Sequence, residues 1–235
     1  MAAAVTESSS LQERAPGFWV LNGWGPAWVM AGAAGRSADL AELKDALPTA
    51  RGFAQAEQVH GSSMAVIQHV VDEAHPVAGC DAMLTSLPRM PLVIRTADCL
   101  PLMLVDPVRR AIGIAHAGWR GLAAGLPLKL LAAFRHTFQS RPEDLLVAIG
   151  PAIHPCCYEV GPEFERSFGP FVQLRGSRRT CDLIGAAIDQ FRRGRVAPLH
   201  IIDSQQCTAC TGSPWYSIRR EGQTTGRLLS FIVIR

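Results

Sequence analysis

The sequence lacks several patterns that would assign it to a familiar class. No apolar run approaches the roughly 20 residues that a membrane-spanning helix requires. The N-terminus has no basic segment followed by an apolar one, so we expect no secretory signal. There is no Walker loop, no GxGxxG and no GxSxG, which argues against nucleoside-triphosphate, dinucleotide and serine-hydrolase sites. The net charge is only +3 and the basic residues are scattered, which argues against a nucleic-acid partner.

The composition is that of a packed globular protein. The 235 residues are 48% hydrophobic and 18% charged, and strand-like and helix-like segments alternate without repeats or a clear linker. We expect an α/β fold: a single-domain layered sandwich with a mixed β-sheet over residues 17–235, after a disordered leader over 1–16. Seven cysteines without a secretory signal indicate reduced thiols in a cytoplasmic protein. We expect a small-molecule partner, no membrane contact, and a monomer or homodimer.

The most informative stretch is residues 92–121. Two apolar runs, 102–105 and 111–115, flank a turn that contains a proline and charges, which predicts a β-hairpin. If Asp106 lies opposite Arg109, Cys99 faces His116, and their Cβ atoms are ~4.5–5.5 Å apart. This spacing suits joint metal ligation or a Cys–His pair. The alternative is a small buried cysteine and a hydrogen-bonded core histidine.

The other elements follow from periodicity and turn residues. A strand is expected to end at Val59, which would place His60 at a strand end. Residues 32–37 read as a flexible loop, and the C-terminal region reads as a second hairpin with a polar tip over 219–227. The expected helices cover 39–47, 122–138 (starting or kinked at Pro127) and 182–193.

Three residues form a candidate metal site. Two imidazoles and one thiolate, from His60, Cys99 and His116, suit zinc, with copper as the alternative. Three protein ligands leave a fourth position for water or substrate, as catalytic zinc requires. The sequence does not show whether His60 reaches the other two residues, because it lies 39 positions before Cys99.

The remaining cysteines form no zinc-finger pattern. Cys207 and Cys210 make a CxxC, but there is no second CxxC or HxxxH at suitable spacing. We interpret these two as incidental thiols and the adjacent Cys156 and Cys157 as structural ones.

Six motifs resemble a known family over roughly residues 54–235. They are QVHG at 58–61, TADCLP at 96–101, HAGWRG at 116–121, GPAI at 150–153, YEVG at 158–161, and SIRR at 217–220 followed by TGR at 225–227. Together they resemble the YfiH-like laccase-domain family, also called multicopper polyphenol oxidoreductases. The resemblance implies a single α/β sandwich domain and a metal on His60, Cys99 and His116.

The resemblance also implies an activity. The family is associated with zinc-dependent phosphorolysis of adenosine, inosine, guanosine and methylthioadenosine, and with adenosine deamination. Its older label is copper-dependent polyphenol oxidation (laccase), and some members are described as peptidoglycan editing factors. One departure lies at 29–37, where the threonines of the family's TTRxGGxS-like stretch are missing and Arg36 stands for its arginine.

We therefore predict a zinc-dependent purine nucleoside phosphorylase with adenosine deaminase activity, acting on purine nucleosides and phosphate. Guanidinium groups match phosphate geometry, so arginines near the motifs are candidates for phosphate binding. Asp98 and Glu159 are candidates for proton handling. The expected catalytic residues are Cys99, His116, Asp98 and Arg120, and the expected substrate-binding residues are Arg227, Arg219 and Glu159.

Three alternatives remain open. One is a Cys–His hydrolase of a peptidoglycan precursor, with Cys99 as nucleophile and His116 as base. Another is a copper-dependent polyphenol oxidase, although seven histidines without an HxH pair argue against a multicopper centre. The third is a degenerate family member that binds purines without turnover.

Overall fold

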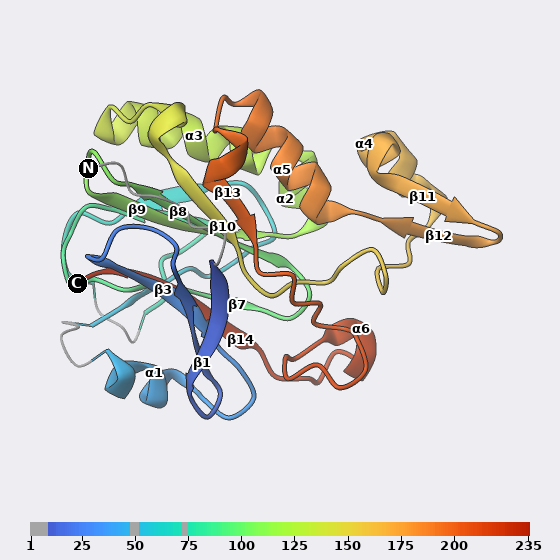
Figure 1. Cartoon of the computed structure of the whole chain (residues 1–235), viewed down its shortest axis with the longest axis horizontal. Coiled ribbons are helices and arrows are strands. Elements are labelled where there is room, and N and C mark those ends of the chain that lie inside the picture. The colour runs from blue at the N-terminus through green and yellow to red at the C-terminus, as the bar shows by residue number, and fades with distance from the viewer. Residues whose placement is uncertain (1–8, 48–51, 72–74) are drawn as a thin grey trace.

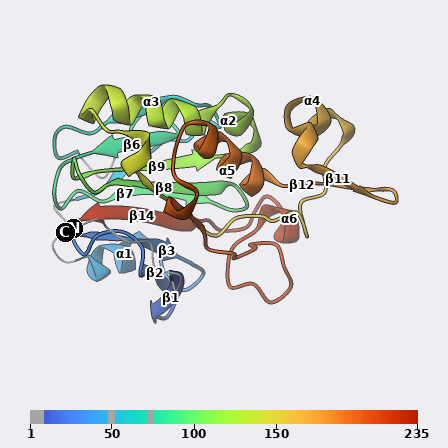
Figure 2. The same cartoon turned by 45° about the horizontal axis from the view of Figure 1, so that its top comes forward.

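Two six-stranded sheets packed face to face form the centre of the molecule. The computed structural model describes residues 9–47, 52–71 and 75–235. Helices cover the outer faces of both sheets, which gives a four-layer α/β/β/α arrangement (Figures 1 and 2). The expected single-domain α/β sandwich with mixed pairing is confirmed, and the strands divide between two sheets.

The first sheet is antiparallel except at one edge, where β4 runs parallel to β7. Its strands, in spatial order, are β1 (Ser10–Ala15), β2 (Phe18–Asn22), β3 (Val29–Ala34), β14 (Leu228–Ile234), β7 (Leu92–Thr96) and β4 (Ala54–Gln55).

The second sheet has parallel pairs at both edges, β13 with β10 and β5 with β6. Its strands, in order, are β13 (Ile201–Asp203), β10 (Leu146–Ile149), β8 (Leu100–Asp106), β9 (Ala111–Ala117), β6 (Ala82–Thr85) and β5 (Met64–Val66).

The α-helices are α1 (Leu40–Ala46), α2 (Trp119–Ala123), α3 (Leu126–Phe138), α4 (Glu165–Phe168), α5 (Leu183–Arg193) and α6 (Ile218–Glu221). Helices α2, α3 and α5 pack on the second sheet and α1 packs on the first, whereas α4 and α6 lie beyond the end of the sandwich (Figure 1). A hairpin of β11 (Val172–Arg175) and β12 (Arg178–Cys181) extends beyond the sandwich beside α4 (Figure 1). In the part of the chain that the structure describes, no helix is long and apolar enough to cross a membrane.

Strand β8 shows why its apolar run is continuous. Successive side chains of a strand point to opposite faces. Leu102 and Leu104 pack in the cluster formed with α3 and α5, whereas Met103 and Val105 pack in the cluster between the two sheets. A strand buried on both faces has no polar side to alternate with its apolar one.

Helices α1, α3 and α5 begin where the sequence predicts. Asp39 and Glu42 form a capping box at α1, and the Asp182 carboxylate accepts a hydrogen bond from the Gly185 N–H at the start of α5. Pro127 lies in the first turn of α3, the first of its two expected positions. A Cβ at Gly113 of β9 would lie 2.8 Å from Phe134 of α3, so glycine allows this helix to approach the sheet closely.

Four expectations about local structure are wrong. Residues 10–15 form β1 instead of a disordered leader; residues 1–8 lie outside the described residues. The loop expected over 32–37 is β strand as far as Ala34, because this segment pairs with both β2 and β14. The expected strand to Val59 is only β4, and His60 lies in a loop. The C-terminal region is no hairpin, because β14 inserts between β3 and β7 after α6.

The central hairpin exists, but with a different register. Strands β8 and β9 pair Asp106 with Ala111 and Pro101 with His116, two positions from the expected alignment. The four-residue turn is stabilised by the Asp106 carboxylate, which accepts hydrogen bonds from the N–H groups of Val108 and Arg109. Cys99 therefore lies in the bend before β8. It still lies beside the end of β9, where a Cβ on Gly118 would be 3.3 Å from its sulfur.

Candidate metal centre and substrate cavity

Three separate segments bring His60, Cys99 and His116 together. His60 comes from the loop between β4 and β5, Cys99 from the bend before β8, and His116 from the end of β9. One potential ligand atom of each residue lies within 4.8 Å of those of the other two. The rings of His60 and His116 meet edge to face, with centroids 4.7 Å apart. The structure thus brings all three residues together. They include His60, for which the sequence does not show proximity to the other two.

Asp81 organises two of the three segments, and sequence reasoning missed it. Its fully buried carboxylate lies 2.8 Å from Nδ1 of His116 and accepts hydrogen bonds from the backbone N–H groups of His60 and Gly61. Because Nδ1 of His116 is engaged, Nε2 is left to face a metal. A carboxylate behind a ligating histidine is the usual second layer of a metal site.

These contacts also shift the pKa values of Asp81, Cys99 and His116. Burial alone would raise the pKa of the Asp81 carboxyl, but hydrogen bonds from His116, Gly61 and His60 outweigh it and lower the pKa. Burial would likewise raise the pKa of Cys99, yet hydrogen bonds and charge from the two histidines lower it to about 7. Burial would lower the pKa of His116, whereas Asp81 and Cys99 raise it to about 9. The environment therefore favours a thiolate on Cys99, the form that binds metals and acts as a nucleophile.

The backbone around the trio occupies an uncommon conformation. The φ angles of Gln58, His60 and Asp98 are 63°, 58° and 91°, in the left-handed region that non-glycine residues seldom adopt. Gln58 is held by two hydrogen bonds between its side-chain amide and the backbone of Arg95. Such conformations persist where surrounding contacts fix them, and they concentrate at functional sites.

Asp98 is held by contacts on both carboxylate oxygens. One accepts a hydrogen bond from the Thr208 hydroxyl at 2.6 Å, and the other accepts from the backbone N–H of Arg219 at 2.8 Å. Its backbone carbonyl also accepts from the N–H of Ile153. Asp98 thus ties the bend that carries Cys99 to two distant loops. Its observed contacts are those of a positioning residue.

A cavity of about 640 Å³ opens beside the trio. His60, Cys99 and His116 line it together with two arginines, Arg95 and Arg227. A second cavity of about 610 Å³ shares both arginines and adds Arg36 and Tyr216. Volumes of this size accommodate small organic ligands.

The expected site residues differ in their distance from this cavity. Arg227 lines it, with its guanidinium donating to the backbone carbonyls of Thr225 and Gly226. Arg120 stacks on the Trp119 ring at 4.3 Å and is absent from the lining. Arg219 donates to the backbone carbonyl of Glu159, whose exposed carboxylate pairs with Arg178. Residues of the lining that sequence reasoning missed are Arg95, Gln58 and Glu57.

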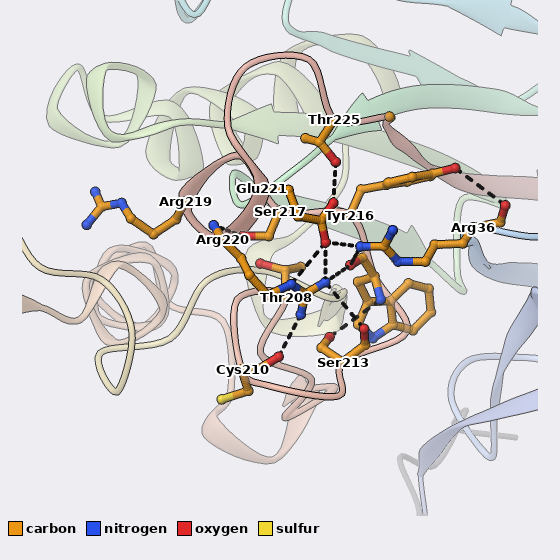
Figure 3. A network of polar contacts seen from close by, with 12 residues as sticks. Arg36, Thr208, Cys210, Ser213, Tyr216, Ser217, Arg219, Arg220, Glu221 and Thr225 are labelled. Atoms are coloured by element: carbon orange, nitrogen blue, oxygen red, sulfur yellow. Dashed lines mark hydrogen bonds and ion pairs between the residues drawn. The ribbon is translucent and has the colours of Figure 1, made fainter.

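A polar network joins the α6 region to β3. The Arg220 guanidinium donates to the backbone carbonyls of Cys210 and Trp215, and Glu221 pairs with both Arg220 and Arg36 (Figure 3). The Thr225 hydroxyl donates to the other side of the Glu221 carboxylate. Arg36 therefore occupies a defined place beside the second cavity, even though the surrounding stretch departs from the family pattern.

The structure corrects one interpretation of the cysteines. Cys156, Cys157, Cys207 and Cys210, read above as incidental or structural thiols, gather in a second cluster with all four sulfurs within 4.8 Å of one another. None of the four lines the cavity at the trio.

The fold and the site define a two-sheet α/β sandwich with a candidate metal centre at a cavity. The family model described as "Multi-copper polyphenol oxidoreductase laccase" matches residues 36–235. The chain belongs to this family of YfiH-like laccase-domain proteins.

Relatives agree in sequence and structure. The chain is 34% identical over 191 residues to "Purine nucleoside phosphorylase YlmD" of Geobacillus stearothermophilus, covering 75% of this chain and 70% of that protein. It is 32% identical over 184 residues to "Purine nucleoside phosphorylase YfiH" of Escherichia coli K12, covering 75% and 71%. The crystal structure of YlmD from G. stearothermophilus superposes with a TM-score of 0.85 at 29% identity, covering 97% of this chain and 99% of that chain.

Proposed function

We propose that the protein is a zinc-dependent purine nucleoside phosphorylase. The observation that carries the proposal is a single cavity lined by both the His–Cys–His trio and two arginines, Arg95 and Arg227. Potential metal ligands and potential phosphate-binding groups thus line one cavity, an arrangement that suits a metal-assisted reaction between a nucleoside and phosphate. Relatives that match about three quarters of the chain carry the name of this activity.

The donor set fits zinc. Two imidazole nitrogens and one thiolate are borderline and soft ligands, and three protein ligands are the number found at catalytic zinc sites. The hydrogen bond from Nδ1 of His116 to Asp81 fixes the ring in the orientation that a metal ligand needs. When bound, zinc supplies Lewis acidity toward an oxygen at the open position. Copper is the alternative ion for the same donors.

The arginines of the cavity lining bind phosphate, and a carboxylate of the lining transfers protons. Arg95 and Arg227 bind the phosphate through charge-assisted hydrogen bonds and hold it against the nucleoside. This binding stabilises the charge that develops as the glycosidic bond breaks. Glu57, a carboxylate of the cavity lining, is placed better than Glu159 for proton transfer to the base.

Adenosine deamination is a second activity of the same cavity. Zinc deaminases combine histidine and cysteine ligands with a non-ligating glutamate that transfers protons. Here His60, Cys99 and His116 supply such a ligand set, and Glu57 lies in the same lining. Adenosine would then yield inosine, a further substrate for phosphorolysis.

The test uses the full chain loaded with zinc. Inosine with phosphate should yield hypoxanthine and ribose 1-phosphate, and omission of phosphate should abolish the reaction. Arg227→Ala should raise the KM for phosphate far more than that for inosine, with Arg192→Ala, on the far helix α5, as matched control. Absence of hypoxanthine release, under conditions where the G. stearothermophilus relative releases it, contradicts the proposal. Adenosine supplied without phosphate tests the deaminase activity by its conversion to inosine.

The Cys–His hydrolase remains the rival function, because the pKa values of Cys99 and His116 also suit a thiolate–imidazolium pair. The two functions differ in their need for metal. A hydrolase keeps its activity after chelation and loses it on alkylation of Cys99. A zinc enzyme loses its activity on chelation and regains it when zinc is added.

A further inference from the structure

Four cysteines from two distant segments meet at one place in the fold. Strands β10 and β13 are parallel neighbours, so the loops that follow them leave the same edge of the second sheet. The first loop carries Cys156 and Cys157, and the second carries Cys207 and Cys210. A parallel bridge between Ala152 and Cys207 and a hydrogen bond from the Thr208 N–H to the Ala152 carbonyl align the two loops.

The sulfur–sulfur distances have a specific meaning. The Sγ atom of Cys156 lies 3.7 Å from those of Cys157, Cys207 and Cys210, and the Cys157–Cys210 distance is also 3.7 Å. A disulfide would require about 2.05 Å. A tetrahedron of thiolates around zinc has Zn–S bonds of about 2.3 Å, which places the sulfurs about 3.8 Å apart. The cluster therefore has the dimensions of a tetrathiolate metal site.

The surroundings of the cluster suit thiolate ligands. The backbone N–H groups of His154 and Ala209 hydrogen-bond to the Cys207 sulfur. N–H donors around a ligand sulfur orient it and disperse its charge, as outer-layer groups do at metal sites generally. Arg178 donates to the Cys156 carbonyl and Arg220 donates to the Cys210 carbonyl, so cations lie on both loops of the cluster. A doubly negative tetrathiolate zinc complex benefits from such positive charge.

We propose that Cys156, Cys157, Cys207 and Cys210 bind a structural zinc ion, separate from the candidate metal centre at His60, Cys99 and His116. Four protein ligands close the coordination shell, so this ion has no open position for water or substrate. Its effect is to cross-link two loops that are about 50 positions apart in the sequence. Closing a loop of that length stabilises the native state, as a disulfide does.

The cross-link reaches the cavity through hydrogen bonds. Thr208, inside the CxxC, donates to the Asp98 carboxylate, and Asp98 precedes Cys99 of the trio. Arg220 connects Cys210 to the Trp215 carbonyl and to Glu221 (Figure 3). The second ion therefore positions the loops around the first site without contacting the substrate.

Metal stoichiometry of the full chain tests the proposal. Protein purified with zinc under reducing conditions is measured by inductively coupled plasma mass spectrometry. Cys207→Ser should lower the content by about one zinc ion per chain and the melting temperature by about 5 °C or more. Cys181→Ser, at a buried cysteine outside both clusters, is the matched control and should leave the stoichiometry unchanged.

A second measurement covers the case in which Cys207→Ser does not fold. The Cys99→Ser variant disables the trio and retains all four cysteines of the cluster. Loaded with cobalt, it should show the intense sulfur-to-cobalt charge-transfer and d–d absorption of a tetrahedral tetrathiolate complex. Three results would overturn the proposal: cobalt-loaded Cys99→Ser without these bands, iron in place of zinc in the purified chain, or equal zinc in wild type and Cys207→Ser. Because the experiment measures no turnover, its outcome is independent of the proposed phosphorylase activity.

Discussion

The two candidate metal sites differ in the number of potential ligands and in what surrounds them. The His60–Cys99–His116 trio offers three ligands and lines a cavity of about 640 Å³. The Cys156–Cys157–Cys207–Cys210 cluster offers four sulfurs and does not line that cavity. A metal with three protein ligands can bind a substrate atom, whereas one with four is closed. This difference supports the two roles proposed above, chemistry at the first cluster and loop cross-linking at the second.

The contacts that hold the two clusters in place also differ. The trio depends on a buried carboxylate, Asp81, which fixes the orientation of one ring and the position of one loop. The cysteine cluster depends on backbone hydrogen bonds between two loops. A catalytic ligand requires a defined orientation, while a cross-link requires only that the loops meet.

Replacing one proposed ligand in each cluster should separate the catalytic role from the structural one. This comparison has the largest expected effect. His116→Ala should lower kcat/KM for phosphorolysis at least about 100-fold, since even outer-layer partners of a ligand contribute 10–100-fold. Cys207→Ser should lower the melting temperature and change kcat/KM less than about tenfold. Kinetics with inosine and thermal unfolding measure both quantities on both variants. Equal losses of activity in the two variants would contradict the division of roles.

Removing the support of the trio should give the next largest effect. Asp81→Ala leaves the N–H groups of His60 and Gly61 and the Nδ1 of His116 without their acceptor. We expect metal affinity and activity to fall about 10–100-fold and the free energy of unfolding to fall by about 3 kcal/mol. Competition with a zinc chelator and urea unfolding measure the two losses. Asp106→Ala, at a turn on the opposite end of the hairpin, is the control: it should cost stability while zinc affinity stays unchanged.

Alkylation of its thiolate should distinguish Cys99 of the trio from Cys156 of the cysteine cluster in the metal-free protein. A pKa of about 7 leaves Cys99 about half ionised at neutral pH. Its alkylation rate should therefore rise with pH around a midpoint near 7, whereas the pKa of Cys156 is raised to about 11, first by burial and then by its sulfur neighbours. Mass-spectrometric mapping of iodoacetamide adducts across pH measures the difference. Added zinc should protect Cys99, and unchanged labelling would argue against metal ligation there.

The polar network around Glu221, which joins the α6 region to Arg36, should give the smallest effect. Hydrogen bonds from Thr225, Arg220 and Arg36 lower the pKa of Glu221 from 4.5 to about 2. A lowered carboxyl pKa contributes stability above the unfolded-state value, and the contribution is lost as pH falls towards the folded-state value. Glu221→Gln should thus melt below wild type at pH 6, and the gap should narrow between pH 4.5 and 2. A gap independent of pH would show that the Glu221 charge does not stabilise this network.

The sequence indicates much of the trio because two of its members flank one hairpin. Cys99 and His116 meet even though the register differs by two positions from the expected one, since any hairpin over 92–121 brings these ends together. The residue type of His60 makes it a candidate ligand, but only the family motif QVHG implies that it joins the other two, since the predicted strand to Val59 is limited to β4 and gives no cross-strand alignment. Asp81 escaped notice because its role depends on β6 pairing with β9, a contact without a local signal.

The cysteine cluster shows the limit of reasoning from spacing. Cys207–Cys210 lacks a second CxxC, and the adjacent Cys156–Cys157 supplies the missing pair only through the parallel alignment of β10 and β13. Arg95 was missed for the same reason. It becomes a cavity residue because β14 inserts between β3 and β7, and the sequence suggested a separate C-terminal hairpin there.

The sequence by itself determined three helix starts, the central apolar strands and which chemically reactive side chains this protein has. Capping residues and proline set the starts of α1, α3 and α5, and apolar runs set the central strands, because these signals act within a few residues. Only the tertiary structure decided which of these side chains come into contact. Strand order and parallel pairing are set by burial of whole sheet faces, a property of distant segments together, and they place the trio at a cavity and the four cysteines at 3.7 Å contacts.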